Sequence, residues 1–292
     1  MPVIRLRRRV ESAVPPVRTV AIQATRGWAS LRLGALWEYR ELLFFLIWRD
    51  VKVRYKQTAL GVLWVLLQPV TSVAIFTLLF GVLLKVDSGG IPYPVFALAG
   101  LLPWNYFSQA LSRSSASVVN SSHLITKVYF PRLVIPLSGV LSSLLDFFVA
   151  FSVLVFLMIV YGVAPTARLM VLPALVLLAM ATALGFGLWL SALNVRYRDV
   201  NYLLPFLIQI WMYVTPVVYG SSLIPERFRF VLSLNPMTGV VEGFRWALLG
   251  PASVGDYLSP PLVAISVCVS VAVLLGGAYF FRRTERSFAD II

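Results

Sequence analysis

Long stretches without charge constrain this chain more than any other feature of its sequence. A helix needs roughly 20 apolar residues to cross a bilayer core of about 30 Å, and each stretch meets that length. The runs are continuously apolar and lack the polar–apolar alternation of a membrane barrel, which favours helices. The predicted spans are 60–84, 91–111, 133–161, 169–195, 200–218 and 257–281.

The composition agrees with an all-α membrane protein of six transmembrane helices. Of the 292 residues, 59% are apolar and 13% are charged, whereas a soluble domain usually has about 25% charged residues. A soluble protein of this size must still cover a wide surface with polar groups. An ordinary soluble domain is therefore excluded.

The distribution of basic residues predicts the orientation of the chain. The formal net charge is +13, and 12 of the 25 Lys and Arg residues precede residue 57. If both termini are cytoplasmic, 20 basic residues lie inside and 5 outside, which follows the positive-inside rule. Because the excess is concentrated near one end, it does not indicate a nucleic-acid partner. We expect both termini in the cytoplasm.

Two segments precede the first span. Residues 1–34 form a predicted basic cytoplasmic arm, and 35–56 a predicted amphipathic helix in the inner membrane interface. Five charged residues share one side of this helix on a helical wheel, namely Glu38, Glu41, Arg49, Lys52 and Lys56. The helix is either a topological anchor or a collar that guides a charged headgroup toward a pore.

Two further segments depart from simple spans. In the cytoplasmic loop 120–132, Ser121 or Ser122 is placed to cap a short helix that ends before Pro131. Such a helix suits docking of a soluble partner, and a plain connecting loop is the alternative. On the outer side, prolines divide 219–256 into two short apolar stretches, Phe228–Leu234 and Met237–Leu249. These predict short re-entrant helices between the fifth and sixth spans, with an ordinary extracellular loop as the alternative.

Asp146 is the only charged residue within the predicted spans. An ionisable group at such a position is a functional candidate by default. The alternative is a structural residue that Ser or Arg of a neighbouring helix satisfies. The spans offer no second acid or histidine, so a proton relay is not expected.

The chain carries no motif that would supply energy or covalent chemistry. It has no G-x-x-x-x-G-K-[ST] phosphate loop, no H-E-x-x-H and no G-x-S-x-G. With one histidine and one cysteine, a metal site built by the protein is not expected either. We therefore expect the chain to borrow its energy from a partner.

Six stretches, in order along the chain, carry a resemblance to a known family. They are LIWRDVKVRYKQTALGVLWVLLQPV (Leu46–Val70), GLLPWNYFSQAL (Gly100–Leu111), NSSHLITKVYFPRLVIPLSGVLSSLLDF (Asn120–Phe147), NVRYRDV (Asn194–Val200), WMYVTPVVY (Trp211–Tyr219) and NPMTGVVEGFRWALLG (Asn235–Gly250). Together they resemble the permease subunit of type-2 ABC exporters of polysaccharides, which export O-antigen, capsule or teichoic acid. The arm before about residue 35 has no counterpart that we can name.

The resemblance implies a homodimer in the bacterial inner membrane, with two copies of a separate nucleotide-binding ATPase on its cytoplasmic side. ATP and Mg²⁺ would bind that partner, and this chain would hold no cofactor and no metal. The implied substrate is a glycan, such as O-antigen, linked through pyrophosphate to a polyprenyl lipid. The loop matching Asn120–Pro131 would contact the ATPase.

Three groups of residues follow as candidate sites. Cations at the inner interface suit the pyrophosphate headgroup, and these are Arg49, Lys52, Arg54 and Lys56. Aromatic side chains give sugars a surface to slide over, although Trp and Tyr also collect at membrane interfaces. They are Trp104, Tyr106, Phe107, Trp211, Tyr213 and Tyr219. The candidates for ATPase docking are Ser122, His123, Lys127, Tyr129 and Arg132.

Three other functions compete with export of O-antigen. Export of teichoic acid or capsular polysaccharide fits the same family. A type-2 exporter of drugs or small lipids would share the spans but should lack the stretch Leu46–Val70. A membrane enzyme acting on polyprenyl-linked sugars would need an acid pair or a catalytic base, and the inner loops offer only Asp199 near Arg196 and Arg198.

Overall fold

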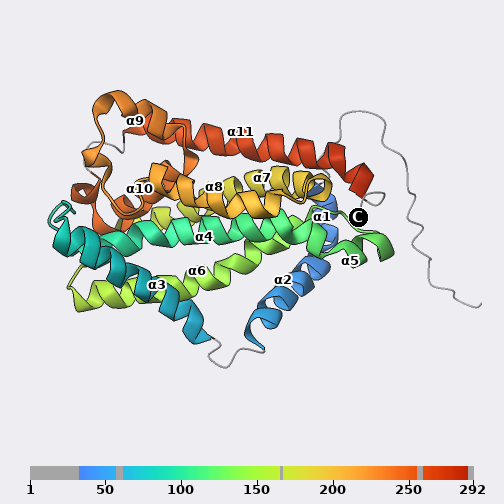
Figure 1. Ribbon diagram of the computed structural model, residues 1–292, viewed down its shortest axis with the longest axis horizontal. Helices are drawn as coiled ribbons and strands as arrows, with labels where there is room; N and C mark the ends of the chain where they lie inside the picture. Colours follow the sequence, from blue (N-terminus) through green and yellow to red (C-terminus); the bar gives the residue numbers. More distant parts are fainter. Residues whose placement is uncertain (1–32, 57–61, 165–166, 255–258, 289–292) are drawn as a thin grey trace, which may run out of the picture. The chain divides into compact units, whose positions relative to one another are not determined.

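The apolar runs of the sequence fold into helices. The computed structural model describes residues 33–56, 62–164, 167–254 and 259–288, and every regular element in these ranges is helical (Figure 1). These ranges belong to one compact unit, Leu31–Ile292. All but the last two residues of the predicted arm 1–34 lie outside the described residues. The prediction of an all-α chain is confirmed for the described part.

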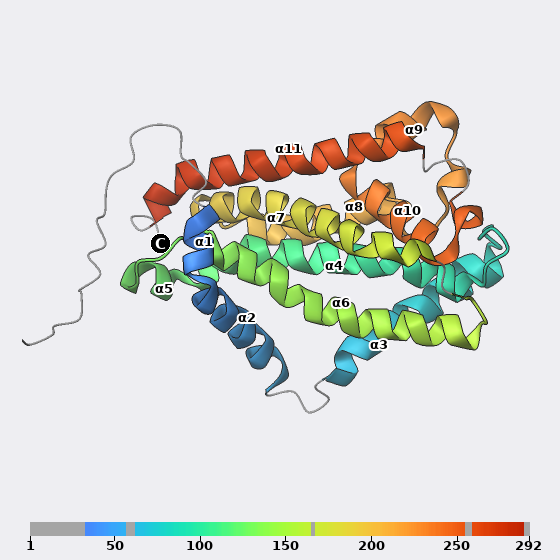
Figure 2. The same ribbon diagram turned by 180° about the vertical axis from the view of Figure 1, so that it is seen from behind.

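Four long helices form the body of the bundle. They are α4 (Tyr93–Asn120), α6 (Val134–Val160), α7 (Leu172–Arg196) and α11 (Pro260–Thr284). Helix α4 packs against α6 and α7, and α11 packs on α7 (Figures 1 and 2). Close contact between α4 and α7 depends on Gly187, because a Cβ there would lie 2.6 Å from the Cβ of Ser114. As a result, α4 is buried along most of its length.

Four helical stretches are long and apolar enough to cross a membrane, and they coincide with the first, third, fourth and sixth predicted spans. They are Leu66–Leu83, Val134–Val160, Ala167–Arg196 and Pro260–Ser287. The first combines α3 (Val62–Phe76) with a π-helix, η1 (Thr77–Leu83). The third of them joins the short helix η2 (Ala167–Val171) to α7, and the fourth joins α11 to η6 (Glu285–Ser287).

The second and fifth spans remain predictions. The second lies within α4, which is long enough but carries polar side chains such as Asn105, Gln109 and Arg113 along its length. The fifth lies in α8 (Val200–Val214), which has only 15 residues, or about 22 Å. It stops earlier than the predicted 218 because Pro216 disfavours a helical conformation at Thr215, where the backbone turns extended.

The predicted helix over 35–56 forms as two pieces, α1 (Leu33–Glu38) and α2 (Arg40–Tyr55), which meet at Tyr39. Helix α2 packs along α6 and buries Leu46, whereas Phe44, Phe45 and Trp48 are exposed. Charged and apolar residues are spread around α2, so it is far less amphipathic than predicted. Its position relative to a membrane stays a prediction.

The short helices at the two ends of the bundle lie close to the stretches in which the sequence predicts them. Helix α5 (Ser122–Lys127) follows Ser121, although the Ser121 side chain makes no capping hydrogen bond. A 3-10 turn, η3 (Ser221–Leu223), precedes α9 (Glu226–Ser233) and α10 (Pro236–Leu249). Asn235 caps α10 by accepting a hydrogen bond from the backbone N–H of Met237. Helix α9 and helix α5 lie at opposite ends of the bundle (Figures 1 and 2), and whether α9 and α10 re-enter the membrane stays a prediction.

Candidate functional site

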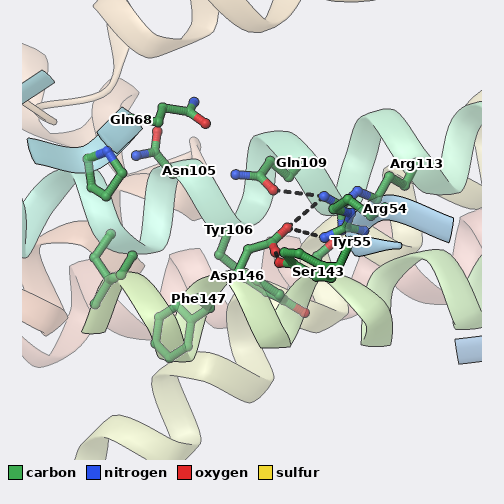
Figure 3. A pocket seen from close by; sticks show the side chains of 13 residues that line it. Arg54, Tyr55, Gln68, Asn105, Tyr106, Gln109, Arg113, Ser143, Asp146 and Phe147 are labelled. Atoms are coloured by element: carbon green, nitrogen blue, oxygen red, sulfur yellow. Dashed lines mark hydrogen bonds and ion pairs between the residues drawn. The ribbon is translucent and has the colours of Figure 1, made fainter. Parts of the chain in front are cut away.

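A cavity of about 320 Å³ opens between α2, α3, α4 and α6. We call it the central cavity, and its polar lining residues are Arg54, Tyr55, Gln68, Asn105, Tyr106, Gln109, Arg113, Ser143 and Asp146. The charged side chains gather at one end, and Gln68 and Asn105 lie together at the other (Figure 3). Apolar residues from α3, α4 and α6 complete its walls.

Asp146 is the centre of the charged end. Its Oδ2 accepts a short hydrogen bond from Nη1 of Arg54 and one of 2.6 Å from Nη2 of Arg113 (Figure 3). Its Oδ1 accepts a hydrogen bond of 2.6 Å from the Tyr55 hydroxyl. Arginines of two neighbouring helices thus satisfy Asp146, as the structural alternative for this residue expected, and its functional role stays a prediction. Three helices, α2, α4 and α6, meet at one carboxylate.

Arg113 is held on both sides within this cluster. Its Nη1 donates to the Ser143 hydroxyl at 3.1 Å, and its Nη2 also donates to Oε1 of Gln109 at 3.0 Å. Gln109 lies one helical turn before Arg113 on α4, so the two side chains share one face. These contacts orient the Arg113 guanidinium toward Asp146.

Tyr55 acts as a neutral donor in this cluster. Its pKa is raised to about 12, first because the hydroxyl is partly buried and second because it donates to the Asp146 carboxylate. The phenol therefore keeps its proton throughout the physiological pH range. Tyr55 and Arg54 are consecutive residues at the end of α2, so the whole end of this helix is bound to α6.

A second cavity, of about 370 Å³, lies on the other side of the arginines. Arg54 and Arg113 line both cavities. The further polar lining residues of the second cavity are Arg49, Asp50, Ser117, Asn120, Ser121, Ser138 and Ser142. Polar side chains thus line two cavities that share Arg54 and Arg113, one near the start of α6 and one that includes the amides of Gln68 and Asn105.

The four predicted headgroup cations do not gather at one point. Arg54 reaches Asp146, whereas Arg49 pairs with Asp50 at 2.9 Å and lines the second cavity. Lys52 and Lys56 are exposed. Sequence reasoning did not include Arg113 among these cations, although it lies just beyond the predicted second span.

The predicted glycan-path aromatics are mostly core residues. Trp104 and Phe107 are buried, and they pack with Phe186 around Trp211, with ring centroids 4.9 to 6.5 Å apart. In this conformation Trp104 and Phe107 offer no surface to a sugar, because the interhelical packing covers them. Tyr106 lines the central cavity, Tyr213 is exposed, and the Tyr219 hydroxyl donates to the Tyr213 carbonyl at 3.0 Å.

The predicted docking residues divide into two groups. His123, Lys127 and Tyr129 are exposed on or just after α5, and Ser122 is partly exposed. Arg132 differs, because it donates to the backbone carbonyl of Glu285 and lies over the Phe288 ring. Arg132 thus holds the loop to the C-terminal end of α11 rather than forming part of an open surface.

Helix α10 carries a buried ion pair that the sequence analysis does not predict. Glu242 and Arg245 are both fully buried, and Arg245 donates to the carbonyls of Pro216, Val217 and Tyr219. Arg245 thereby satisfies three backbone carbonyls in the turn that ends α8. An acid and a base three residues apart in an otherwise apolar stretch were a signal for it, because such a pair shares one helix face.

Comparison with known proteins shows which family and which proteins this chain is similar to. The model of the ABC-2 type transporter family matches residues 41–249. The O-antigen export system permease protein RfbA of Myxococcus xanthus is 32% identical over 260 residues, which cover 88% of this chain and 97% of the relative. The protein of the same name from Klebsiella pneumoniae is 30% identical over 254 residues, 86% and 95% of the two chains. The polysialic acid transport protein KpsM of Escherichia coli is 25% identical over 242 residues, 81% and 91%.

Proposed function

The chain belongs to the ABC-2 type transporter family, and we propose that it is the membrane permease of an ATP-driven exporter of a lipid-linked polysaccharide. The observation that carries this proposal is the match along 97% of the length of an O-antigen export permease. Identities of 32% and 30% to two such permeases, against 25% to a polysialic acid transporter, favour O-antigen over capsule as the cargo.

A separate ATPase is the energy source in this proposal. The sequence has no phosphate loop of its own, and energy must therefore come from another chain. The exposed residues at α5 suit a docking contact, since His123 and Lys127 on this short helix and Tyr129 just after it are exposed, and α5 lies at one end of the bundle (Figure 1). Two copies of the chain, each with one ATPase, would form the transporter in the inner membrane with both termini cytoplasmic.

The substrate in this proposal is a glycan joined to a polyprenyl lipid through pyrophosphate. Support comes from Arg49, Arg54 and Arg113, which give the linings of the two cavities a cationic character. The amides of Gln68, Asn105 and Gln109 in the central cavity offer both donors and acceptors to sugar hydroxyls.

Deletion of the gene tests the proposed function. We expect loss of long-chain polysaccharide from the cell surface, with accumulation of the lipid-linked glycan inside the cytoplasmic membrane. The wild-type gene should restore export only when the partner ATPase is able to hydrolyse ATP. Normal surface polysaccharide in the deletion strain would overturn the proposal, and loss of capsule with O-antigen retained would overturn the choice of cargo.

A further inference from the structure

We propose that Arg54 and Arg113 form a binding site for a phosphate or pyrophosphate group, and that Asp146 is an internal anion which this group displaces. The assignment of the group to a lipid carrier rests on the proposed function. The binding site itself rests on the geometry and charge of the central cavity.

Convergence of donors on one carboxylate is the first observation. Arg54 and Arg113 come from different helices, yet both donate to the same oxygen, Oδ2 of Asp146. Guanidinium groups bind phosphate oxygens in the same geometry as carboxylate oxygens. A phosphate at this point would meet the donors that now hold Asp146, with Tyr55 beside them.

Charge is the second observation. The cluster contains two guanidinium groups and one carboxylate, so it carries one positive charge in excess. Among the described residues that line the two cavities, the other acid is Asp50, and it pairs with Arg49 at 2.9 Å. The excess charge lies between partly buried side chains, where an anion gains more than it would in water.

Access is the third observation. The Arg54 side chain is 24% exposed and lines both cavities. Within the described part of the chain, Nη1 of Arg54 donates to Asp146, whereas its Nη2 and Nε have no acceptor. The central cavity, at about 320 Å³, is at the lower end of the usual range for small-molecule sites. An anion can therefore reach Arg54 before Asp146 moves.

The walls of the cavity indicate what is attached to the phosphate. The cavity is also lined by the apolar side chains of Leu102, Phe147 and Ala150 and by the amides of Asn105 and Gln109. Apolar walls suit the first units of a prenyl chain, and the amides suit a sugar. A lipid phosphate fits this mixed lining better than a free inorganic anion.

Displacement of Asp146 would also weaken the attachment of the end of α2. In the described residues, the ion pair that joins α2 to α6 is the one between Arg54 and Asp146. A phosphate that takes over Arg54 removes this ion pair while keeping both arginines neutralised, and it leaves the hydrogen bond from Tyr55 to Oδ1 of Asp146. Binding of a headgroup is thereby coupled to movement of the end of α2.

Binding measurements on the full chain with its ATPase in nanodiscs test the inference. The probes are farnesyl pyrophosphate and inorganic pyrophosphate, with empty nanodiscs as the blank. We expect Arg54→Gln and Arg113→Gln each to raise the Kd for farnesyl pyrophosphate by about tenfold or more, because each removes a charge-assisted contact. Asp146→Asn should lower the Kd by about threefold or more, because the competing anion is gone.

Matched variants keep the test decisive. Arg40→Gln removes an arginine from the exposed start of the same helix and should change the Kd by less than about twofold. Arg54→Lys keeps the charge if the glutamine variant does not fold, and should still weaken binding because an ammonium lacks the planar pair of donors with which a guanidinium binds two oxygens of one phosphate.

Three results would overturn the inference. Unchanged affinity for farnesyl pyrophosphate in both Arg54 variants would show that Arg54 is not part of a binding site. Weaker binding in Asp146→Asn would show that Asp146 does not compete with the phosphate. Equal affinity for the two probes would contradict the assignment to a lipid headgroup. In each case export can remain intact, whereas loss of the proposed function would show as normal surface polysaccharide in the deletion strain.

Discussion

Glu242 and Arg245 form an ion pair with no exposure of either side chain, and 3.0 Å separates Glu242 Oε1 from Arg245 Nη1. The Arg245 guanidinium also lies over the Phe96 ring, 3.9 Å from its centroid. Through these contacts α10 is joined to α4 and to the turn after α8. A charge buried this deeply is tolerated only while its partners stay in place.

Removal of one partner should therefore be costly. Glu242→Ala leaves the Arg245 charge unpaired, and we expect the free energy of unfolding to fall by about 3–5 kcal/mol. Glu226 and Arg229 form an i, i+3 pair on α9, but Glu226 is 87% exposed. Glu226→Ala should cost less than about 1 kcal/mol. Unfolding of both variants in nanodiscs measures the difference, and equal losses would contradict the structural role of the pair.

Gly100 on α4 provides the space for this guanidinium. A Cβ at this position would lie 2.7 Å from Nη2 of Arg245 and would also meet the carbonyl of Val217. Gly100→Ala should lower the free energy of unfolding by about 1–3 kcal/mol through overpacking. Gly34 has no atom within 4 Å of a built Cβ, so Gly34→Ala is the matched control and should not destabilise α1. An unchanged free energy of unfolding in Gly100→Ala would show that the turn after α8 can move away from the added methyl group.

Local sequence signals predicted most helices close to their observed positions. The boundary between α9 and α10 follows the Asn235–Pro236 pair, because proline restricts the residue before it and favours the first turn of a helix. The end of α8 was predicted too late, at 218, although Pro216 was a signal for an earlier end. The short helix α5 lies inside the predicted docking loop. These features depend on neighbours in sequence, which a single chain displays directly.

The site consists of contacts between residues that are far apart in the sequence, so the sequence alone did not predict them. Asp146 lies 92 residues from Arg54 and 33 from Arg113. The sequence therefore indicated that its partners are Ser or Arg residues, but not which ones they are. On a helical wheel of 35–56, Arg54 lies off the side shared by the five charged residues named above, and this is a signal that it faces the bundle. The prediction that Trp104 and Phe107 form a surface for the glycan failed for a different reason. Aromatic residues are common at membrane interfaces, on sugar-binding surfaces and in cores, so their type does not distinguish these roles.

The attachment of α2 to Asp146 should be visible as protection from hydrogen exchange. Arg54→Gln removes the ion pair to α6, and we expect amides in the last two turns of α2 to exchange about threefold faster or more. Asp146→Asn should give the same pattern. Arg40→Gln, at the other end of α2, serves as the control and should leave these amides unchanged. Equal exchange in all variants would show that apolar packing around Leu46 holds α2 alone.

Variants of Lys127 and Arg132 should separate docking from stability at the loop 120–132. Lys127 is exposed at the end of α5, whereas Arg132 binds the carbonyl of Glu285 and covers the Phe288 ring. Lys127→Glu should reduce copurification of the ATPase by about fivefold or more while changing the Tm by less than about 1 °C, since a solvated charge contributes little to folding. Arg132→Glu should lower the Tm as well, because it breaks the contact between the loop and the end of α11. If Lys127→Glu retains the ATPase while Arg132→Glu loses it, the ATPase contacts the loop near α11 and not the exposed face of α5.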